Sequence, residues 1–168
     1  MKTNISGLMS LISEYEKKLL TIENLLGANV YSMSIQELNG TINIIEDTKE
    51  EFNLNLDEYN KLLNKVTYLK SVLYEKNNTF TLSDNRTIQT AIIDNSNLRK
   101  QKALYESFLY NKNSKRRVTE VNNSYFECKT INFDLNKIKE DLVIISNKLQ
   151  KTDFEISKLN SIEFDIND

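Results

Sequence analysis

The sequence predicts a mainly α-helical protein, with about four long helices packed as an antiparallel, coiled-coil-like bundle and one short β-hairpin. The 168 residues include no proline and three glycines, so nothing forces a break in a long helix. Apolar residues recur at alternating spacings of three and four positions, which is the pattern of coiled-coil seams. The length suits one domain spanning residues 1–168.

The first predicted helix covers residues 5–27. Its apolar stripe is Ile5, Leu8, Ile12, Tyr15, Leu19, Ile22 and Leu26. Gly27 after this stripe fits a left-handed helix cap. Residues 28–48 show a weaker pattern, which predicts a loosely ordered connector with a short helix around residues 34–38. Long connectors in small domains are often functional.

The second predicted helix covers residues 49–76. Its stripe is Phe52, Leu56, Tyr59, Leu63, Val66, Leu69 and Val72/Leu73. A short extended stretch follows, and then a turn in which Asn85 is expected to take a positive φ. Thr87 is the expected N-cap of a third helix over residues 88–110.

Residues 111–131 are expected to form a loop and a strand. Residues 111–117 are polar and basic, and residues 125–131 alternate between apolar and polar side chains. This alternation predicts a short strand that pairs with residues near Phe80. The last helix is expected over residues 133–160, with Asn132 as its cap and a frayed acidic tail beyond it.

Composition excludes several kinds of chemistry. The chain has no His and one Cys, so catalytic triads with His, zinc sites with His and four-thiolate sites are unavailable. Carboxylate pairs remain, as at Glu46/Glu50 and Glu140/Asp141, where a solvated helix face competes with a metal or catalytic site. We therefore predict a non-enzymatic protein without metal or cofactor.

The formal net charge of −2 and a pI near 5.4 give no global field that attracts nucleic acid or anionic membranes. No apolar run reaches the roughly 20 residues of a membrane span. The N-terminus leads into amphipathic helix and not into a signal peptide. These observations predict a cytoplasmic location, and they weigh against membrane interaction without excluding it.

Polar residues interrupt the apolar stripe of the third helix at Asp94, Asn95 and Arg99. A buried polar layer there would fix helix register or oligomeric state at some cost in stability. Plain exposure and a ligand site are the alternatives.

One cationic cluster occurs, at Lys112, Lys115, Arg116 and Arg117. Such a cluster can hold phosphates or another anionic partner, or it can be a solvated loop. Cys128 is either an inert buried residue or a reactive thiol, and reactivity would require exposure and a lowered pKa.

Self-association is expected from the width of the helix stripes. A seam of only a and d positions is narrow, and Tyr and Phe side chains lie outside it. A homo-oligomer is the natural way to bury them. We therefore predict a helical scaffold or interaction module that associates with itself.

A family resemblance rests mainly on the centre of the chain. The motif there is Leu82-Ser83-Asp84-Asn85-Arg86-Thr87-Ile88, preceded by Asn77-Asn78-Thr79. Residues 8–26 and 130–160 extend the likeness. Together these segments resemble the septicolysin family, small bacterial helical proteins that are uncharacterised. Asn85 stands where the family has Gly in the sequence Asp-Gly-Arg/Lys-Thr-Leu.

The resemblance implies a helical fold and, from the family name, an oxygen-labile cytolysin. The family's Asn-Trp near the end of the last helix is Asn160-Ser161 in this chain, which has no Trp. Thiol-activated pore formers that bind cholesterol use a Cys in a Trp-rich loop, whereas Cys128 stands between Glu127 and Lys129. A membrane-active cytolysin is therefore the alternative function, and a carboxylate-bound metal enzyme is a third.

Overall fold

The mainly α-helical class is confirmed. The structure is a computed structural model that describes residues 1–121 and 123–166. These residues form four helices: α1 (Ile5–Ala28), α2 (Lys49–Thr79), α3 (Ile88–Phe108) and α4 (Leu135–Asn160). The strands are β1 (Lys2–Thr3), β2 (Met33–Gln36), β3 (Ile42–Glu46), β4 (Ser114–Thr119), β5 (Ser124–Lys129) and β6 (Phe164–Asp165).

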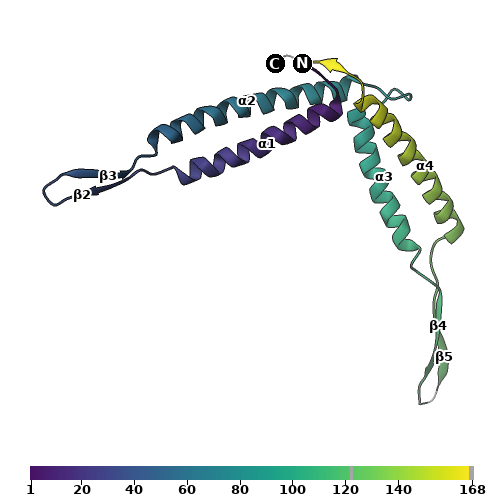
Figure 1. Ribbon diagram of the computed structural model, residues 1–168. Coiled ribbons are helices and arrows are strands. Elements are labelled where there is room, and N and C mark those ends of the chain that lie inside the picture. The colour runs from purple at the N-terminus through teal and green to yellow at the C-terminus, as the bar shows by residue number, and fades with distance from the viewer. Residues whose placement is uncertain (122, 167–168) are drawn as a thin grey trace. The chain divides into compact units, whose positions relative to one another are not determined.

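The chain divides into two compact units, and the single domain over residues 1–168 stays a prediction. Unit 1 contains residues 1–79 and residues from 160 onward, and unit 2 contains residues 80–159. Both repeat one arrangement, in which two helices are joined by an antiparallel β-hairpin: α1–β2–β3–α2 in unit 1 and α3–β4–β5–α4 in unit 2 (Figure 1). The packing of all four helices into one bundle stays a prediction.

Unit 1 is held together by the predicted stripe of α1. Buried α1 residues are Ile5, Leu8, Ile12, Leu19 and Ile22, and all five belong to that stripe. Leu8 and Ile12 pack with Leu69 of α2 and with Ile166. Burying an aliphatic side chain of this kind stabilises the fold by about 1.5–3 kcal/mol. Asn4 caps the helix, because its side chain accepts a hydrogen bond from the backbone N–H of Gly7 at 2.8 Å.

The acidic tail after α4 was expected to fray, but its residues 163–166 form part of unit 1, and residues 167–168 lie outside the described residues. β6 pairs antiparallel with β1. The amino group of Met1 donates to the carbonyl of Ile166 at 2.8 Å, and the Ile166 N–H donates to the Met1 carbonyl at 2.9 Å. Phe164 and Ile166 alternate with acidic residues, so this short ribbon turns apolar side chains toward the helices.

The predicted connector over residues 28–48 is an ordered hairpin, and the short helix expected at residues 34–38 is wrong. β2 and β3 pair with Ile35 opposite Asn43 and with Ser34 opposite Ile44. The turn contains Asn39-Gly40, and Gly40 has a φ of 88°. The Glu37 N–H donates to the Thr41 carbonyl at 2.8 Å, which closes a three-residue hairpin loop.

Unit 2 opens with the predicted turn. Asn85 has a φ of 65°, and Thr87 caps α3, because its hydroxyl accepts from the Thr90 N–H at 3.2 Å. Two expectations were wrong here. Residues 114–117 lie in β4 and not in a loop, and β5 pairs with β4 along its whole length, not with residues near Phe80. Thr81 instead forms an isolated bridge with Thr87.

Two helix ends also differ from expectation. α1 continues past Gly27 to Ala28, with Asn29 as its C-cap, so no left-handed glycine is needed. At the start of α4 the cap is Asp134 and not Asn132, because the Asp134 carboxylate accepts from the N–H groups of Asn136 and Lys137.

Candidate interaction surfaces

The β2–β3 hairpin is fixed firmly where it meets the helices. Thr48 is buried at its base. The Thr48 hydroxyl donates to the carbonyls of Asn29 at 3.1 Å and Tyr31 at 3.2 Å. Its backbone N–H donates to the hydroxyl of Ser32 at 3.1 Å. These bonds join the segment between α1 and β2 to the segment between β3 and α2, so they fix the base of the hairpin beside the two helices.

The hairpin and the segment that leads into it from α1 expose all of their large apolar side chains. Each has an exposed fraction between 49% and 110%: Val30, Tyr31, Met33, Ile35, Leu38, Ile42, Ile44 and Ile45. Ile42 and Ile44 lie on one face, while Ile35 lies on the other face. No residue from Met33 to Glu46 is buried. The hairpin therefore presents an apolar surface on both faces.

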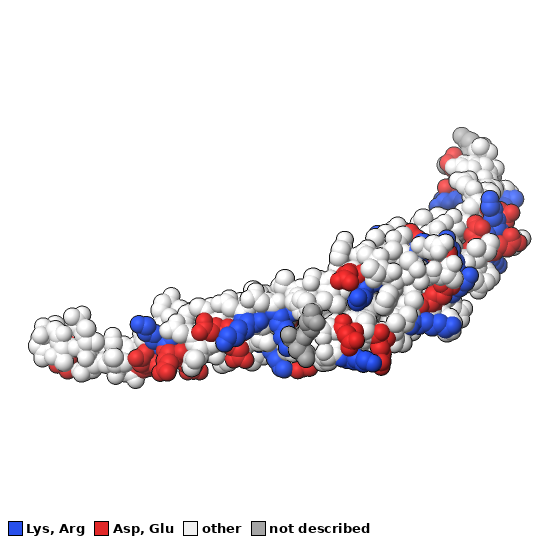
Figure 2. Space-filling view, turned by 90° about the horizontal axis from the view of Figure 1, so that it is seen from above, with Lys and Arg blue, Asp and Glu red and all other residues white. Residues whose placement is uncertain are grey.

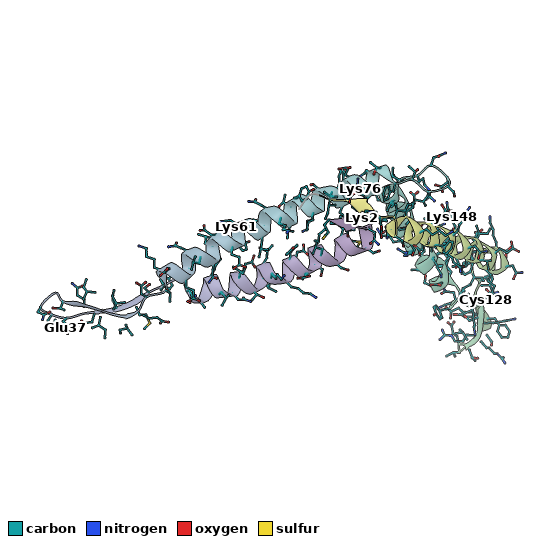
Figure 3. All side chains as sticks on the ribbon, turned by 45° about the horizontal axis from the view of Figure 1, so that its top comes forward. Lys2, Glu37, Lys61, Lys76, Cys128 and Lys148 are labelled. Carbon is teal, nitrogen blue, oxygen red and sulfur yellow. The ribbon has the colours of Figure 1, made fainter. Side chains whose placement is uncertain are left out.

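Charge is scarce on this surface. Between Lys18 and Lys49 the chain has no Lys or Arg, and from residue 29 to residue 46 its only acids are Glu37 and Glu46. Figure 2 shows the hairpin almost entirely white, whereas charged atoms are dense over the helices. Figure 3 places Glu37 at the turn of the hairpin. Its carboxylate accepts from the Asn43 side chain at 3.0 Å.

The β4–β5 hairpin carries most of the predicted cationic cluster. Lys115, Arg116 and Arg117 lie on β4, and Lys112 lies in the segment between α3 and β4. All four side chains are exposed. Arg116 forms an ion pair with Glu127 at 2.8 Å.

The other two strand cations lie beside different partners. The amino group of Lys115 lies 4.2 Å from the ring centroid of Phe126, and Arg117 Nε donates to the Ser124 hydroxyl at 3.0 Å. Sequence reasoning assigned no aromatic partner to these cations, because Phe126 becomes their neighbour only through strand pairing. Cys128 is exposed on the same hairpin (Figure 3).

The three polar residues predicted in the α3 stripe lie near α4. Asn95 is buried, and its side-chain amide donates to Asp153 at 2.8 Å. Arg99 binds both oxygens of the same carboxylate, at 3.0 and 2.9 Å. The amide oxygen of Asn95 has no protein partner among the described residues. The Asn95 bond favours one register of α3 against α4, because sliding either helix would separate the buried amide from Asp153, whereas water can replace the exposed contact of Arg99.

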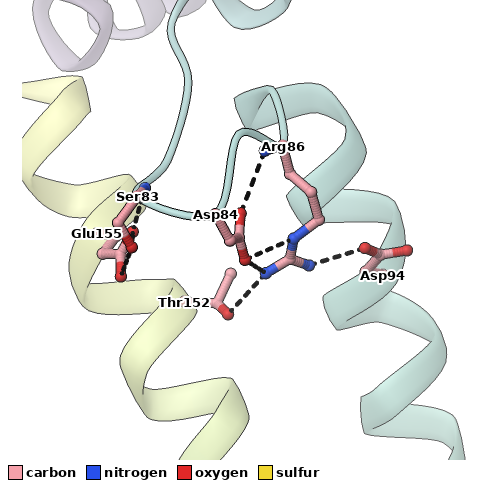
Figure 4. Close-up of polar contacts among 6 residues, drawn as sticks. All are labelled: Ser83, Asp84, Arg86, Asp94, Thr152 and Glu155. Carbon is pink, nitrogen blue, oxygen red and sulfur yellow. Dashed lines mark hydrogen bonds and ion pairs between the residues drawn. The ribbon is translucent and has the colours of Figure 1, made fainter.

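Asp94 belongs to a second polar cluster, which is centred on Arg86 (Figure 4). Arg86 Nη1 donates to Asp94 at 2.7 Å, while Nε and Nη2 donate to Asp84 at 2.9 and 2.7 Å. Nη2 also reaches the hydroxyl of Thr152 on α4 at 3.4 Å. The hydrogen bonds from Arg86 lower the pKa of Asp84, and the two carboxylates raise the pKa of Arg86.

Ser83 and Glu155 hold the same turn from its other side. The Ser83 N–H donates to the Glu155 carboxylate at 2.9 Å, and its hydroxyl lies 2.9 Å from both carboxylate oxygens (Figure 4). The backbone hydrogen bond is the main reason why the pKa of Glu155 is lowered. The residues of the family-like motif thus position the turn that begins α3.

Metal ligands do not gather in the part of the chain that the structure describes. No group of three or more His, Cys, Asp or Glu side chains there could hold a metal ion. Of the carboxylates weighed in the sequence, Glu46, Glu50 and Glu140 are exposed and Asp141 is half-buried. None of the helices, within the described residues, is long and apolar enough to span a membrane.

Sequence reasoning missed the β2–β3 surface, although signals for it exist. Asn39-Gly40 between two alternating segments is a strong hairpin signal. The surrounding stretch is rich in Asn and Ser, which made the turn look like general disorder. The absence of basic residues between Lys18 and Lys49 was a second signal.

Comparison with known proteins supports the fold and adds no activity. No protein-family model matches the chain, and no curated protein matches it. The fold is similar to that in the crystal structure of a functionally unknown conserved protein from Corynebacterium diphtheriae. The likeness covers 98% of this chain and 100% of that one, with a TM-score of 0.63 and 15% sequence identity. The chain therefore shares its fold with a conserved protein of unknown function.

Proposed function

We propose that the protein is a non-enzymatic interaction module that associates with itself through the β2–β3 hairpin. The observation that carries the proposal is the exposure of eight large apolar side chains on a hairpin that has only Glu37 and Glu46 as charges. Single exposed apolar residues are ordinary on a protein surface, but a contiguous patch marks an interaction site.

The area of this patch is sufficient for a stable contact. Burying a large aliphatic side chain contributes about 1.5–3 kcal/mol at about 25 cal/mol per Å², which corresponds to roughly 60–120 Å² of apolar area for each side chain. The eight partly to fully exposed side chains therefore offer on the order of 500 Å² of apolar surface. A standard interface buries about 800 Å² on each partner, of which about 65% is apolar in homodimers. The hairpin alone therefore provides the apolar area that one partner contributes to such an interface.

Stability also favours a bound hairpin. A two-stranded ribbon is marginally stable in water by itself. Both outer edges of β2–β3 carry backbone groups that no further strand in the described part of the chain pairs. Association would cover those edges together with the apolar faces. A protein partner fits better than an anionic lipid surface, because the hairpin has acids and no basic residue to meet phosphate groups.

The test compares the molar mass of wild-type protein with that of an Ile35→Ser/Ile44→Ser variant, measured by light scattering during size-exclusion chromatography. We expect a wild-type oligomer at micromolar concentration and a monomeric variant. The matched control is Val143→Ser/Ile144→Ser, which removes two side chains of similar exposure (60% and 64%) from α4 and should leave the oligomer intact.

Two outcomes would contradict the proposal. If the wild-type protein is monomeric across the micromolar range, it does not associate with itself. If the Ile35→Ser/Ile44→Ser variant is still an oligomer, the contact does not depend on the β2–β3 hairpin. Circular dichroism shows whether each variant keeps its helices. Dye release from cholesterol-containing liposomes, run in parallel, would reveal the membrane activity that the cytolysin alternative requires.

A further inference from the structure

The two faces of the β4–β5 hairpin differ in charge. Directly opposite residues of an antiparallel pair share a face, so the register places Lys115 with Cys128 and Arg117 with Phe126. We call these four residues the Lys115 face. The opposite face holds Arg116 and Glu127, which form an ion pair of 2.8 Å, and it also holds Lys129, which lies opposite Ser114.

The Lys115 face carries two cations and no acid. Lys115 lies over the ring of Phe126, and Arg117 binds the uncharged Ser124 hydroxyl. Phe126 is 57% exposed. The face therefore combines an accessible aromatic ring with cationic charge that no carboxylate among the described residues neutralises. A complementary partner would be apolar, acidic and free of Lys and Arg.

The β2–β3 hairpin has that composition. It is apolar, has acids at both ends in Glu37 and Glu46, and contains no basic residue. Pairing two β2–β3 hairpins about a two-fold axis would gather four carboxylates in one contact without a cation from either hairpin. Complementary charge selects partners and sets register, whereas like charges brought together are costly.

We propose, building on the self-association inferred above, that the Lys115 face of one copy receives the β2–β3 hairpin of another copy. The contact is heterologous, because each chain offers a different surface to its two neighbours. Such contacts repeat until they close into a ring or extend as an open filament. They also weaken as salt screens the charges on Lys115 and Arg117.

Mixing two defective variants tests this arrangement. The Ile35→Ser/Ile44→Ser variant loses two apolar side chains of the β2–β3 hairpin that inserts, and it keeps the Lys115 face. The Lys115→Glu/Arg117→Glu variant reverses the charge of the Lys115 face that receives the hairpin, and it keeps the β2–β3 hairpin. Each variant alone should be monomeric, with association at least about tenfold weaker than wild type. An equimolar mixture should form a dimer and stop there, because only one productive contact remains.

The possible outcomes separate this proposal from the proposed function. If Lys115→Glu/Arg117→Glu still forms the wild-type oligomer, or if the mixture stays monomeric, the heterologous contact is refuted and self-association through β2–β3 stands. If wild-type protein is itself monomeric, both are refuted. Circular dichroism and a thermal melt of each variant confirm that the helices remain folded.

Cross-linking locates the contact directly. Cys128 is the only cysteine in the chain, so an Ile44→Cys variant has one thiol on each of the two surfaces. A short bis-maleimide should link Cys128 of one copy to the introduced thiol of the next. Ile44→Cys/Cys128→Ser should give no covalent dimer, and a dimer from that variant would instead show two β2–β3 hairpins in contact.

Discussion

Replacing Arg86 by alanine tests whether the polar cluster of unit 2 stabilises its turn. The change removes side-chain hydrogen bonds to Asp84 and Asp94 and a longer bond to Thr152. The Arg86 side chain is 22% exposed, whereas those of Asp84 and Asp94 are 49% and 44% exposed. Solvent screening therefore reduces each ion pair to about 0.5–1 kcal/mol.

With the lost packing of the arginine stem included, we expect Arg86→Ala to lower the free energy of unfolding by about 2 kcal/mol. Arg86→Lys should lower it by about 1 kcal/mol, because an ammonium group cannot form the planar fork that binds two carboxylates. Urea unfolding at neutral pH, followed by circular dichroism, measures both values.

An acidic series provides the internal control. The pKa of Asp84 is lowered in the folded protein, so its contribution is present above the unfolded pKa of about 3.9 and is lost as pH falls through the folded value. The cost of Arg86→Ala should shrink over that acidic range. If Arg86→Ala lowers the free energy of unfolding by less than about 0.5 kcal/mol at neutral pH, the polar cluster does not stabilise the turn and the prediction is refuted.

Three further predictions follow from residues described above. Leu69→Ala should lower the free energy of unfolding by about 3 kcal/mol in a urea titration, because the Leu69 side chain is 2% exposed. The control Leu54→Ala, at a position that is 64% exposed, should lower it by less than about 0.5 kcal/mol. Equal losses would contradict the packing of unit 1. Asn85→Gly should preserve the melting temperature and Asn85→Val should lower it, since a φ of 65° disfavours β-branched residues; a stable valine variant would argue against this turn. The Ser83 hydrogen bonds lower the pKa of Glu155, so their contribution to stability is lost as pH falls through the pKa of Glu155 in the folded protein. Glu155→Gln should therefore make the free energy of unfolding less dependent on pH in the acidic range. An unchanged pH dependence in acid titration would contradict that role.

The helices were predictable because their signal is local. The apolar stripes of α1 and α4 repeat over six or more turns. In α4 the 3, 4 spacing predicts a stripe to which the buried residues Ile145, Leu149 and Thr152 belong; its members are Leu135, Ile138, Leu142, Ile145, Leu149, Thr152, Ile156 and Leu159. Asn85 and Thr87 were also predictable, since turn and cap preferences act within a few residues. The division into two units was not predictable, because an a/d stripe shows which face of a helix is buried but does not indicate which other helix packs against that face.

The surfaces depend on information that the sequence holds less directly. Which cations share a face of β4–β5 depends on strand register, and a slip of one residue moves every side chain to the other face. Phe126 therefore becomes a neighbour of Lys115 and Arg117 only in the folded hairpin. The role of Ile166 was missed because its partner, Met1, lies at the other end of the chain.

The pairing of β1 with β6 has a consequence for the order in which the protein folds during synthesis. Unit 2 is a continuous segment, residues 80–159, whereas unit 1 is interrupted by it. On the ribosome the helices of unit 1 emerge before unit 2, yet Leu8 and Leu69 must wait for Ile166, which is synthesised after unit 2. Unit 2 can therefore complete its structure while unit 1 is still open, although chains generally fold from the N-terminus. Removing residues 161–166 would thus destabilise unit 1 and leave unit 2 intact.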